Sequence, residues 1–494
     1  MGTETDLSDA GVVRSRASSL SSINTSVCDS EYYSDAAVSE TFSLETLTPS
    51  ATNYLSYVLD KTLLLLPLAV SIFIRSVVST EFRAMAIAWL LIIPMTTDVT
   101  LDEGVFPALV LSSLGYENRV VELNMFLPIA RSRLGLFTMA LIAFYSENLN
   151  FFVYGILQRS LISFASTLLD NSIPKSELSL ICCALSNAVY YLYYSNQRTL
   201  WNDPTAIIIC GLVAALPCYP LLTCFCKVYR SSRGKDHKNQ NRLAACIYAI
   251  YFLSGATLYF GLMLHSASEL WYEIVNNCDL ILRWLLILTV AIAVAYQFGP
   301  RLGLDGRRKL WHVTTVMMFL PTSVRERPFT KLALGVAIVI FVGLEVIRAV
   351  ALPPIGEPLH NALQGFVDHR DRRGPVIISH IYLLLGIAVP IFLKQSAAGL
   401  ICLGLGDTFA SQVGRRFGKW RVFGQKSLEG CIAFTVAASI AMYYTSDTPN
   451  ILCVVIPTAL LEAVTPLNDN LVVPMYMLAL QGLVTPSWNP DGTL

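Results

Sequence analysis

Residues 403–430 read LGLGDTFASQVGRRFGKWRVFGQKSLEG, and they interrupt a sequence that is apolar on both sides. The stretch contains one Asp, one Glu, five basic residues and six glycines, and the run CIAFTVAASIAMYY follows it at 431–444. Membrane-spanning helices are runs of about 20 mainly apolar residues, and ionisable groups inside them are costly and usually functional. The sequence therefore predicts a helical membrane protein with a functional site at or beside this polar stretch.

The composition of the whole chain agrees with this prediction. Of the 494 residues, 54% are hydrophobic and 14% are charged, whereas soluble domains carry about 25% charged residues. Candidate spans begin near residues 55, 84, 104, 121, 151, 177, 205, 243, 279, 312, 330, 376, 395, 430, 450 and 470. The runs do not alternate as the strands of a membrane barrel do, so we expect an all-α, polytopic transmembrane helical bundle with roughly 13–16 spans.

Three regions are expected along the chain. Residues 1–50 are rich in Ser, Thr and acidic residues, with too few apolar side chains to offset the entropy of ordering, which predicts a disordered cytosolic tail. A phosphorylated regulatory arm and a plain solvated tail are both open for it. Residues 51–299 are expected to form N-terminal transmembrane helices, and residues 300–494 a transmembrane region that carries the chemistry.

Basic residues cluster in the loops 227–242, 301–309 and 414–426. The positive-inside rule places all of these loops on the cytosolic side. Counting spans between them puts 353–375 and 466–470 on the same side, provided that the segment beginning at 312 crosses the membrane.

Several ionisable residues lie in or beside apolar runs. Asp407 has no basic residue within four positions, and an unpaired carboxylate there costs several kcal/mol unless a cation or a donor meets it. It is therefore predicted to bind a divalent cation, with help from Asp469, although a plain polar turn at 468–470 is also open. His312 follows a basic run, and either an interfacial or a catalytic role is open for it. Glu345 and Arg348 share a helix face, as a structural ion pair or a functional one.

The basic stretch itself suits a polyphosphate, and a positive-inside membrane anchor is also open for it. Its glycines permit close approach of the backbone, and its Arg and Lys side chains supply fixed positive charge. It is not a Walker A loop, because the spacing before Lys419 and the residue after it are both wrong. A carboxylate that holds Mg²⁺ beside a loop that holds phosphates predicts phosphoryl transfer, and the membrane setting predicts a lipid acceptor.

Four segments resemble dolichol kinases of the polyprenol kinase family, in order and with the expected spacing, over about residues 300–480. They are RRKLWHV, LEVIRAVALPPIG with FVDHRDRRGPVIISHIYLLLGIAVPI, GDTFAS with GRRFGKWRVFGQKSLEG, and LLEAVTPLNDNLVVPMY. The third departs from the family pattern GTKKTxEG, since GQKSLEG has one basic residue and is one residue shorter.

The resemblance implies CTP-dependent phosphorylation of dolichol, with a divalent cation, at the cytosolic face of the endoplasmic reticulum membrane. With this reading we expect a catalytic set of Asp407, Lys426, Asp469 and His312. The CTP-binding loop implied at 414–429 consists of Gly414, Arg415, Arg416, Gly418, Lys419, Arg421, Gly424, Lys426, Ser427 and Glu429. The residues expected on the acceptor side, or in a structural role, are Glu345, Arg348, Asp368, Arg370 and Asp371.

Other functions are weighed beside this one. A related CTP-dependent kinase of phytol, farnesol or diacylglycerol, or a cytidylyltransferase that makes a CDP-lipid, would use similar parts. A transporter is a rival of another class, but no internal repeat of the kind that transporters show is found. No nucleic-acid partner is expected.

Overall fold

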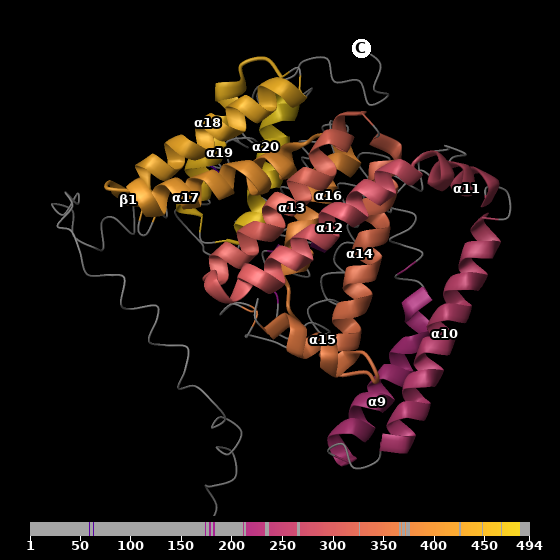
Figure 1. The fold of residues 1–494 in the computed structure, drawn as a ribbon. Coiled ribbons are helices and arrows are strands. Elements are labelled where there is room, and N and C mark those ends of the chain that lie inside the picture. Colours follow the sequence, from indigo (N-terminus) through magenta and orange to yellow (C-terminus); the bar gives the residue numbers. More distant parts are fainter. Residues whose placement is uncertain are drawn as a thin grey trace, which may run out of the picture. The chain divides into compact units, whose positions relative to one another are not determined.

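The computed structural model describes residues 214–484, with gaps at 233–236, 264–266, 326, 365–366, 368–370, 372–375, 424–425, 447 and 466, and a few separate positions between 59 and 211. The tail and most of the predicted N-terminal spans therefore lie outside the described residues. Within them the fold is helical, with one short β-hairpin, as the sequence predicts for its class (Figure 1).

The elements of the first part are η4 (Leu216–Cys218), α9 (Tyr219–Ser232), α10 (His237–Met263), α11 (Ala267–Asn276), α12 (Cys278–Phe298), η5 (Gly299–Arg301), α13 (Leu304–Arg325), α14 (Arg327–Ala349) and α15 (Gly356–Leu363). The elements of the second part are α16 (Ser379–Lys394), η8 (Leu400–Gly406), α17 (Asp407–Phe417), β1 (Arg421–Phe423), β2 (Lys426–Ser427), α18 (Leu428–Thr445), α19 (Ile451–Val464) and α20 (Asp469–Val484).

Among the described helices, three are long and apolar enough to cross a membrane: α12, α14 between Phe329 and Ala349, and α18. The helices α16 and α19 are apolar but shorter. Side chains on the outward faces of the long helices are apolar and exposed, such as Leu286 on α12 and Ile440 on α18. Such faces suit contact with lipid, so the chain is a membrane protein with a helical fold.

The segment that begins at 312, on which the predicted sidedness of 353–375 depends, is part of one continuous helix. α13 runs for 22 residues through Pro321 without turning back, so it is not a re-entrant hairpin. Proline is tolerated within membrane helices because neighbouring groups satisfy the freed backbone. α16, α19 and α20 also contain a proline inside the helix.

The core of the second part forms where α16, η8, α18, α19 and α20 meet. Its fully buried side chains include Tyr382, Phe434 and Tyr476. Two glycines make the closest approach: a Cβ on Gly386 would lie 1.9 Å from the carbonyl oxygen of Asn470, and one on Gly399 would lie 2.1 Å from that of Gly386. The first turn of α20 therefore rests directly on the backbone of α16.

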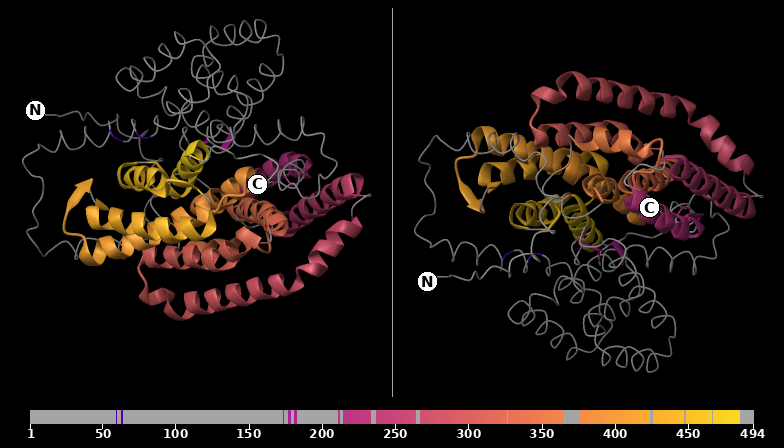
Figure 2. Two further views of the ribbon diagram at one scale, coloured as in Figure 1. Left: turned by 90° about the horizontal axis from the view of Figure 1, so that it is seen from above. Right: turned by 90° about the horizontal axis from the view of Figure 1, so that it is seen from below.

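The hairpin of β1 and β2 joins α17 to α18 and lies at one end of that helix pair (Figures 1 and 2). The strands are antiparallel, with Arg421 opposite Ser427. Sequence reasoning predicts a loop at 414–429, and the structure divides it into the end of a helix, a hairpin and the start of the next helix.

Candidate active site

Asp407 lies at the junction between η8 and α17, and it has a basic partner that the local sequence does not show. η8 is a π-helix, a form that often marks functional sites. The Asp407 side chain is 11% exposed, and its carboxylate pairs with Lys309 of α13, 98 residues earlier in the chain. His312, one turn after Lys309, lies 3.5 Å from the same carboxylate oxygen.

His312 has a defined orientation. Its Nδ1 lies 3.1 Å from the carbonyl oxygen of Leu403. A carbonyl only accepts, so Nδ1 is the donor, and in the neutral imidazole this leaves Nε2 as the proton-accepting nitrogen. Asp407 and His312, both predicted for the site, are thus brought together, although they are far apart in the sequence.

Lys426 and Glu462 form the second half of the cluster. The Lys426 ammonium donates to the Glu462 carboxylate and, at 2.7 Å, to the backbone carbonyl of the same residue. Burial opposes the charged form of Lys426, but Glu462, and then Asp469, outweigh it and raise the pKa of Lys426 above its ordinary value. Lys426 is therefore held charged beside the carboxylates.

Three carboxylates meet at this point. Asp407, Glu462 and Asp469 each offer an oxygen, and these oxygens lie within 4.8 Å of one another. Hard divalent cations such as Mg²⁺ prefer oxygen ligands, often carboxylates. Each carboxylate has two oxygens, so pairing with a lysine leaves a second oxygen for a cation. The donor set fits the predicted metal, with Glu462 added to the predicted ligands Asp407 and Asp469.

The hairpin is fixed by Ser427 and Glu429. The Ser427 hydroxyl accepts from the Gly430 amide at 3.2 Å and caps α18. The Glu429 carboxylate accepts from the backbone amides of Lys419 at 3.0 Å and Trp420 at 3.3 Å. Both side chains, predicted to bind a nucleotide, thus hold the backbone of the loop that would bind it.

The basic side chains of the loop are mostly exposed. Arg415 pairs with Asp305 at the start of α13. Arg416, Lys419 and Arg421 are exposed on the end of α17 and the hairpin. Gly424 lies outside the described residues. Gly414 and Gly418 lie against Ser427, which brings the end of α17 close to the start of α18.

The residues predicted for the acceptor side form a separate polar cluster. Arg348 donates to Glu345 through two bonds of 2.8 and 2.6 Å, and Glu345 also accepts from the Ile377 amide. Asp371 accepts from the amides of Ile378 and Ser379 and from the Ser379 hydroxyl, at 2.7–3.1 Å. These bonds hold the start of α16 and favour the structural alternative. Asp368 and Arg370 lie outside the described residues.

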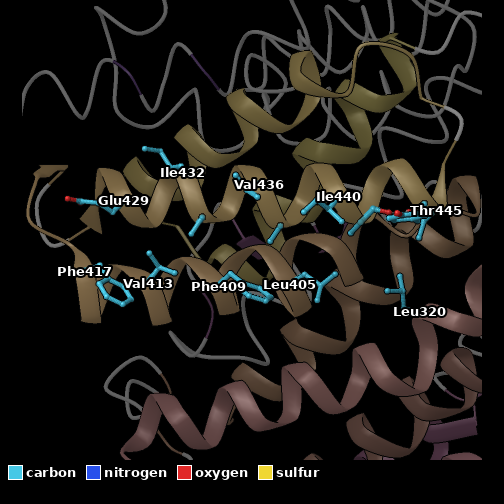
Figure 3. A pocket seen from close by; sticks show the side chains of 14 residues that line it. Leu320, Leu405, Phe409, Val413, Phe417, Glu429, Ile432, Val436, Ile440 and Thr445 are labelled. Carbon is cyan, nitrogen blue, oxygen red and sulfur yellow. The ribbon is translucent and has the colours of Figure 1, made fainter.

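A groove of about 780 Å³ runs between α17 and α18 (Figure 3). It is apolar except for Glu429 at one end and Tyr444 and Thr445 at the other. From η8 and α17 it is lined by every fourth residue: Leu405, Phe409, Val413 and Phe417. Asp407 is two positions from Leu405 and from Phe409, so it lies on another face of the helix. α17 thus carries the apolar groove residues on one face and the carboxylate of Asp407 on another.

Two groups of the cluster are not among the residues predicted for the site. Glu462 gave a signal, because it is an acid in an apolar run beside Pro466. Lys309 lies in a basic run that also fits a membrane anchor, and only the fold shows that it meets Asp407.

The fold and the cluster define a class: a polytopic helical membrane protein with a buried carboxylate–lysine site below a basic hairpin. The chain is similar to curated dolichol kinases. It is 36% identical to one from Saccharomyces cerevisiae over 42% of both chains. It is 31% identical to dolichol kinase EVAN of Arabidopsis thaliana over 58% of this chain and 57% of that one. It is 33% identical to the human dolichol kinase over 41% of this chain and 44% of that one.

The matched segments span about half the length of these relatives, from 42% to 57%. No model of a protein family matches the chain. No solved structure matches it either.

Proposed function

We propose that this protein is a CTP-dependent dolichol kinase, which transfers the terminal phosphoryl group of CTP to dolichol and makes dolichyl phosphate for protein glycosylation. The observation that carries the proposal is the convergence of Asp407, Glu462 and Asp469 with two lysines. The names of the similar proteins support the reaction, and the apolar helices support a lipid acceptor.

The parts of the site match the needs of phosphoryl transfer, which depends on positioning and on neutralisation of charge. A divalent cation, when bound, would neutralise phosphate charge and orient the transferred group. Lys309 holds the Asp407 carboxylate in place, and Lys426 supplies positive charge beside Glu462. The exposed residues Arg416, Lys419 and Arg421, at the end of α17 and on the hairpin, are proposed to bind the phosphates of CTP.

His312 is proposed to accept the hydroxyl proton of the acceptor at Nε2, because Nδ1 is occupied by the Leu403 carbonyl. The apolar groove does not lead directly to Asp407, because Asp407 lies on another face of α17 from the residues that line the groove.

The site is proposed to face the cytosol, in the endoplasmic reticulum membrane, since CTP is supplied from that side. The basic loops 227–242, 301–309 and 414–426 support this orientation.

The test is an assay of purified protein in detergent with labelled CTP or ATP and with dolichol, phytol, farnesol and diacylglycerol as acceptors. We expect labelled dolichyl phosphate from CTP and little from ATP. Equal turnover with ATP, preference for another acceptor, or transfer of a cytidylyl group would contradict the proposal.

A further inference from the structure

Asp469 is held in the cluster by the cap of α20. It is the first residue of that helix, directly after Asn468. The Asn468 side-chain oxygen accepts from the Asn470 amide at 3.1 Å, and its backbone carbonyl accepts from Leu471 and Val472 at 3.1 and 3.0 Å. Asn468 is therefore the N-cap. Asp469 Oδ1 accepts from the same Asn470 amide at 3.0 Å, so the direction of the Asp469 carboxylate depends on this turn.

The amide of this N-cap has no acceptor within its own helix. In a capping box, a Glu or Gln at the third helical position accepts from the amide of the N-cap residue. Here the third position is Leu471, which is apolar and buried. The Asn468 amide instead donates to the carboxylate of Glu177 at 3.0 Å, across 291 residues of sequence. A distant carboxylate takes the place of the local one.

Glu177 is firmly held in this position. It is 5% exposed, and its neighbours Leu178 and Cys182 are also buried. Ile173 and Ile181, four residues before and after it, pack on the same core that contains Leu471. Glu177 and Ile181 are both helical and four apart, so they share a helix face, and this face lies against the core. A buried carboxylate is stable only where it is hydrogen-bonded, as it is here.

We propose that Glu177 is a positioning residue of the candidate site: its carboxylate holds the N-cap of α20 and so keeps Asp469 beside Asp407 and Glu462. The proposal rests on the proposed function of those three carboxylates as a metal site. It also makes the N-terminal half of the chain part of the site, so the region 300–494 does not complete it alone.

The test uses the full-length protein in detergent with Glu177→Ala, Glu177→Gln and the control Gln481→Met. Gln481 lies near the other end of α20, where it is buried and bonded to Ser396 and Thr448. The first measurement is hydrogen exchange at residues 468–472, without metal or nucleotide. We expect faster exchange in Glu177→Ala. Glu177→Gln, whose amide oxygen still accepts, and the control should exchange there like the parent protein.

The second measurement is the shift of the thermal unfolding midpoint with Mn²⁺ alone, followed by the Mg²⁺ dependence of turnover at saturating CTP and dolichol. Groups that orient metal ligands change metal affinity or activity by about 10–100-fold. We expect Glu177→Ala to need about 10-fold more metal in both measurements. KM for CTP at saturating Mg²⁺ should not change. Gln481→Met should lower the amount of folded protein without changing the metal requirement.

The possible failures can be told apart. Unchanged exchange at 468–472 in Glu177→Ala would overturn the placement, whatever the enzyme does. Faster exchange with an unchanged Mn²⁺ requirement would overturn the positioning role, as would a Glu177→Gln variant as impaired as Glu177→Ala. Absence of phosphoryl transfer by the parent protein would refute the proposed function alone, because exchange and Mn²⁺ titration need no substrate. If Glu177→Ala does not accumulate, Glu177→Asp replaces it, since it keeps the charge but shortens the reach.

Discussion

Single residues decide how much charge this protein holds in its interior. Asp407 is buried, and removing one partner of a buried ion pair costs about 3–5 kcal/mol because it leaves a charge uncompensated. Lys309 pairs with the Asp407 carboxylate and keeps it ionised. The pair lies where the carboxylates of Glu462 and Asp469 also meet.

Asp407→Asn keeps the shape of the side chain and removes its charge. We expect a loss of phosphoryl transfer of about 10²–10³-fold, the usual effect of removing one electrostatic contact from such a site. The measurement is turnover of CTP with dolichol, at equal amounts of folded protein in the membrane. Near-normal turnover would exclude Asp407 from the reaction.

Lys426→Ala removes a charge that, in the proposed function, meets the phosphates of CTP both on binding and in the transition state. We therefore expect a higher KM for CTP and a lower kcat together. It also leaves the buried Glu462 without its lysine. Steady-state kinetics at varied CTP provide the measurement. Arg283→Ala is the control, because the pair of Arg283 with Asp279 is exposed. A change confined to the KM for the lipid would place Lys426 away from the phosphates.

At this scale the sequence predicts the acids better than their partners. Asp407 and Asp469 are predicted as metal ligands, and the structure brings them together with Glu462. An acid in an apolar run is visible in the sequence because burying it is costly. Lys309 and Glu177 were not predicted for the site, because their contacts with Asp407 and Asn468 span 98 and 291 residues.

At the scale of elements, the unit of α17, the hairpin and α18 depends on close packing. Gly418 has an extended backbone that any residue can adopt, so space and not conformation requires glycine there. A Cβ at this position would lie 2.1 Å from the carbonyl oxygen of Gly414 and 2.6 Å from the Ser427 hydroxyl. Any larger residue must move the end of α17 away from the hairpin.

Gly418→Ala is therefore expected to displace the basic hairpin and to lower kcat/KM for CTP by about 10–100-fold, since small misplacements have effects of that size. The measurement is CTP kinetics beside a control, Gly343→Ala in α14, where a Cβ would meet nothing within 4 Å. Equal kinetics of the two variants would show that the hairpin tolerates the shift.

The helices themselves are largely predicted by apolar runs, since the described part of the chain has a helix at or close to each predicted span from 243 onward. The π-helix and the hairpin were not predicted. A π-helix of seven residues leaves no distinct periodicity, and strands of three and two residues are too short to show alternation.

At the scale of the whole molecule, the cluster is built where helices begin and end. Asp469 starts α20, Glu462 lies near the end of α19, and Lys309 is in the second turn of α13. α18 and α19 run away from the hairpin and back again, so the hairpin and residue 465 are expected on one side of the membrane and residue 449 on the other. The predicted total of spans stays a prediction, because most of the N-terminal half lies outside the described residues.

Thiol labelling tests this arrangement. In a cysteine-free background on sealed microsomes, Thr465→Cys should react with an impermeant reagent added from outside. Pro449→Cys, in the exposed turn before α19, should react only after permeabilisation. Labelling of both positions from the same side would show that α18 and α19 do not cross the membrane as a pair, and the cytosolic orientation of the site would lose its basis.

The contact of Gly386 with Asn470 has a consequence for natural variation. Neither Gly386 nor Gly399 bears a functional group. A single methyl added to either would nevertheless press against backbone that supports the first turn of α20, and Asp469 is the first residue of that helix. An inherited change from glycine to alanine or serine at either position should therefore behave as a loss-of-function allele. A comparison of the reactive side chains alone would find every one of them intact.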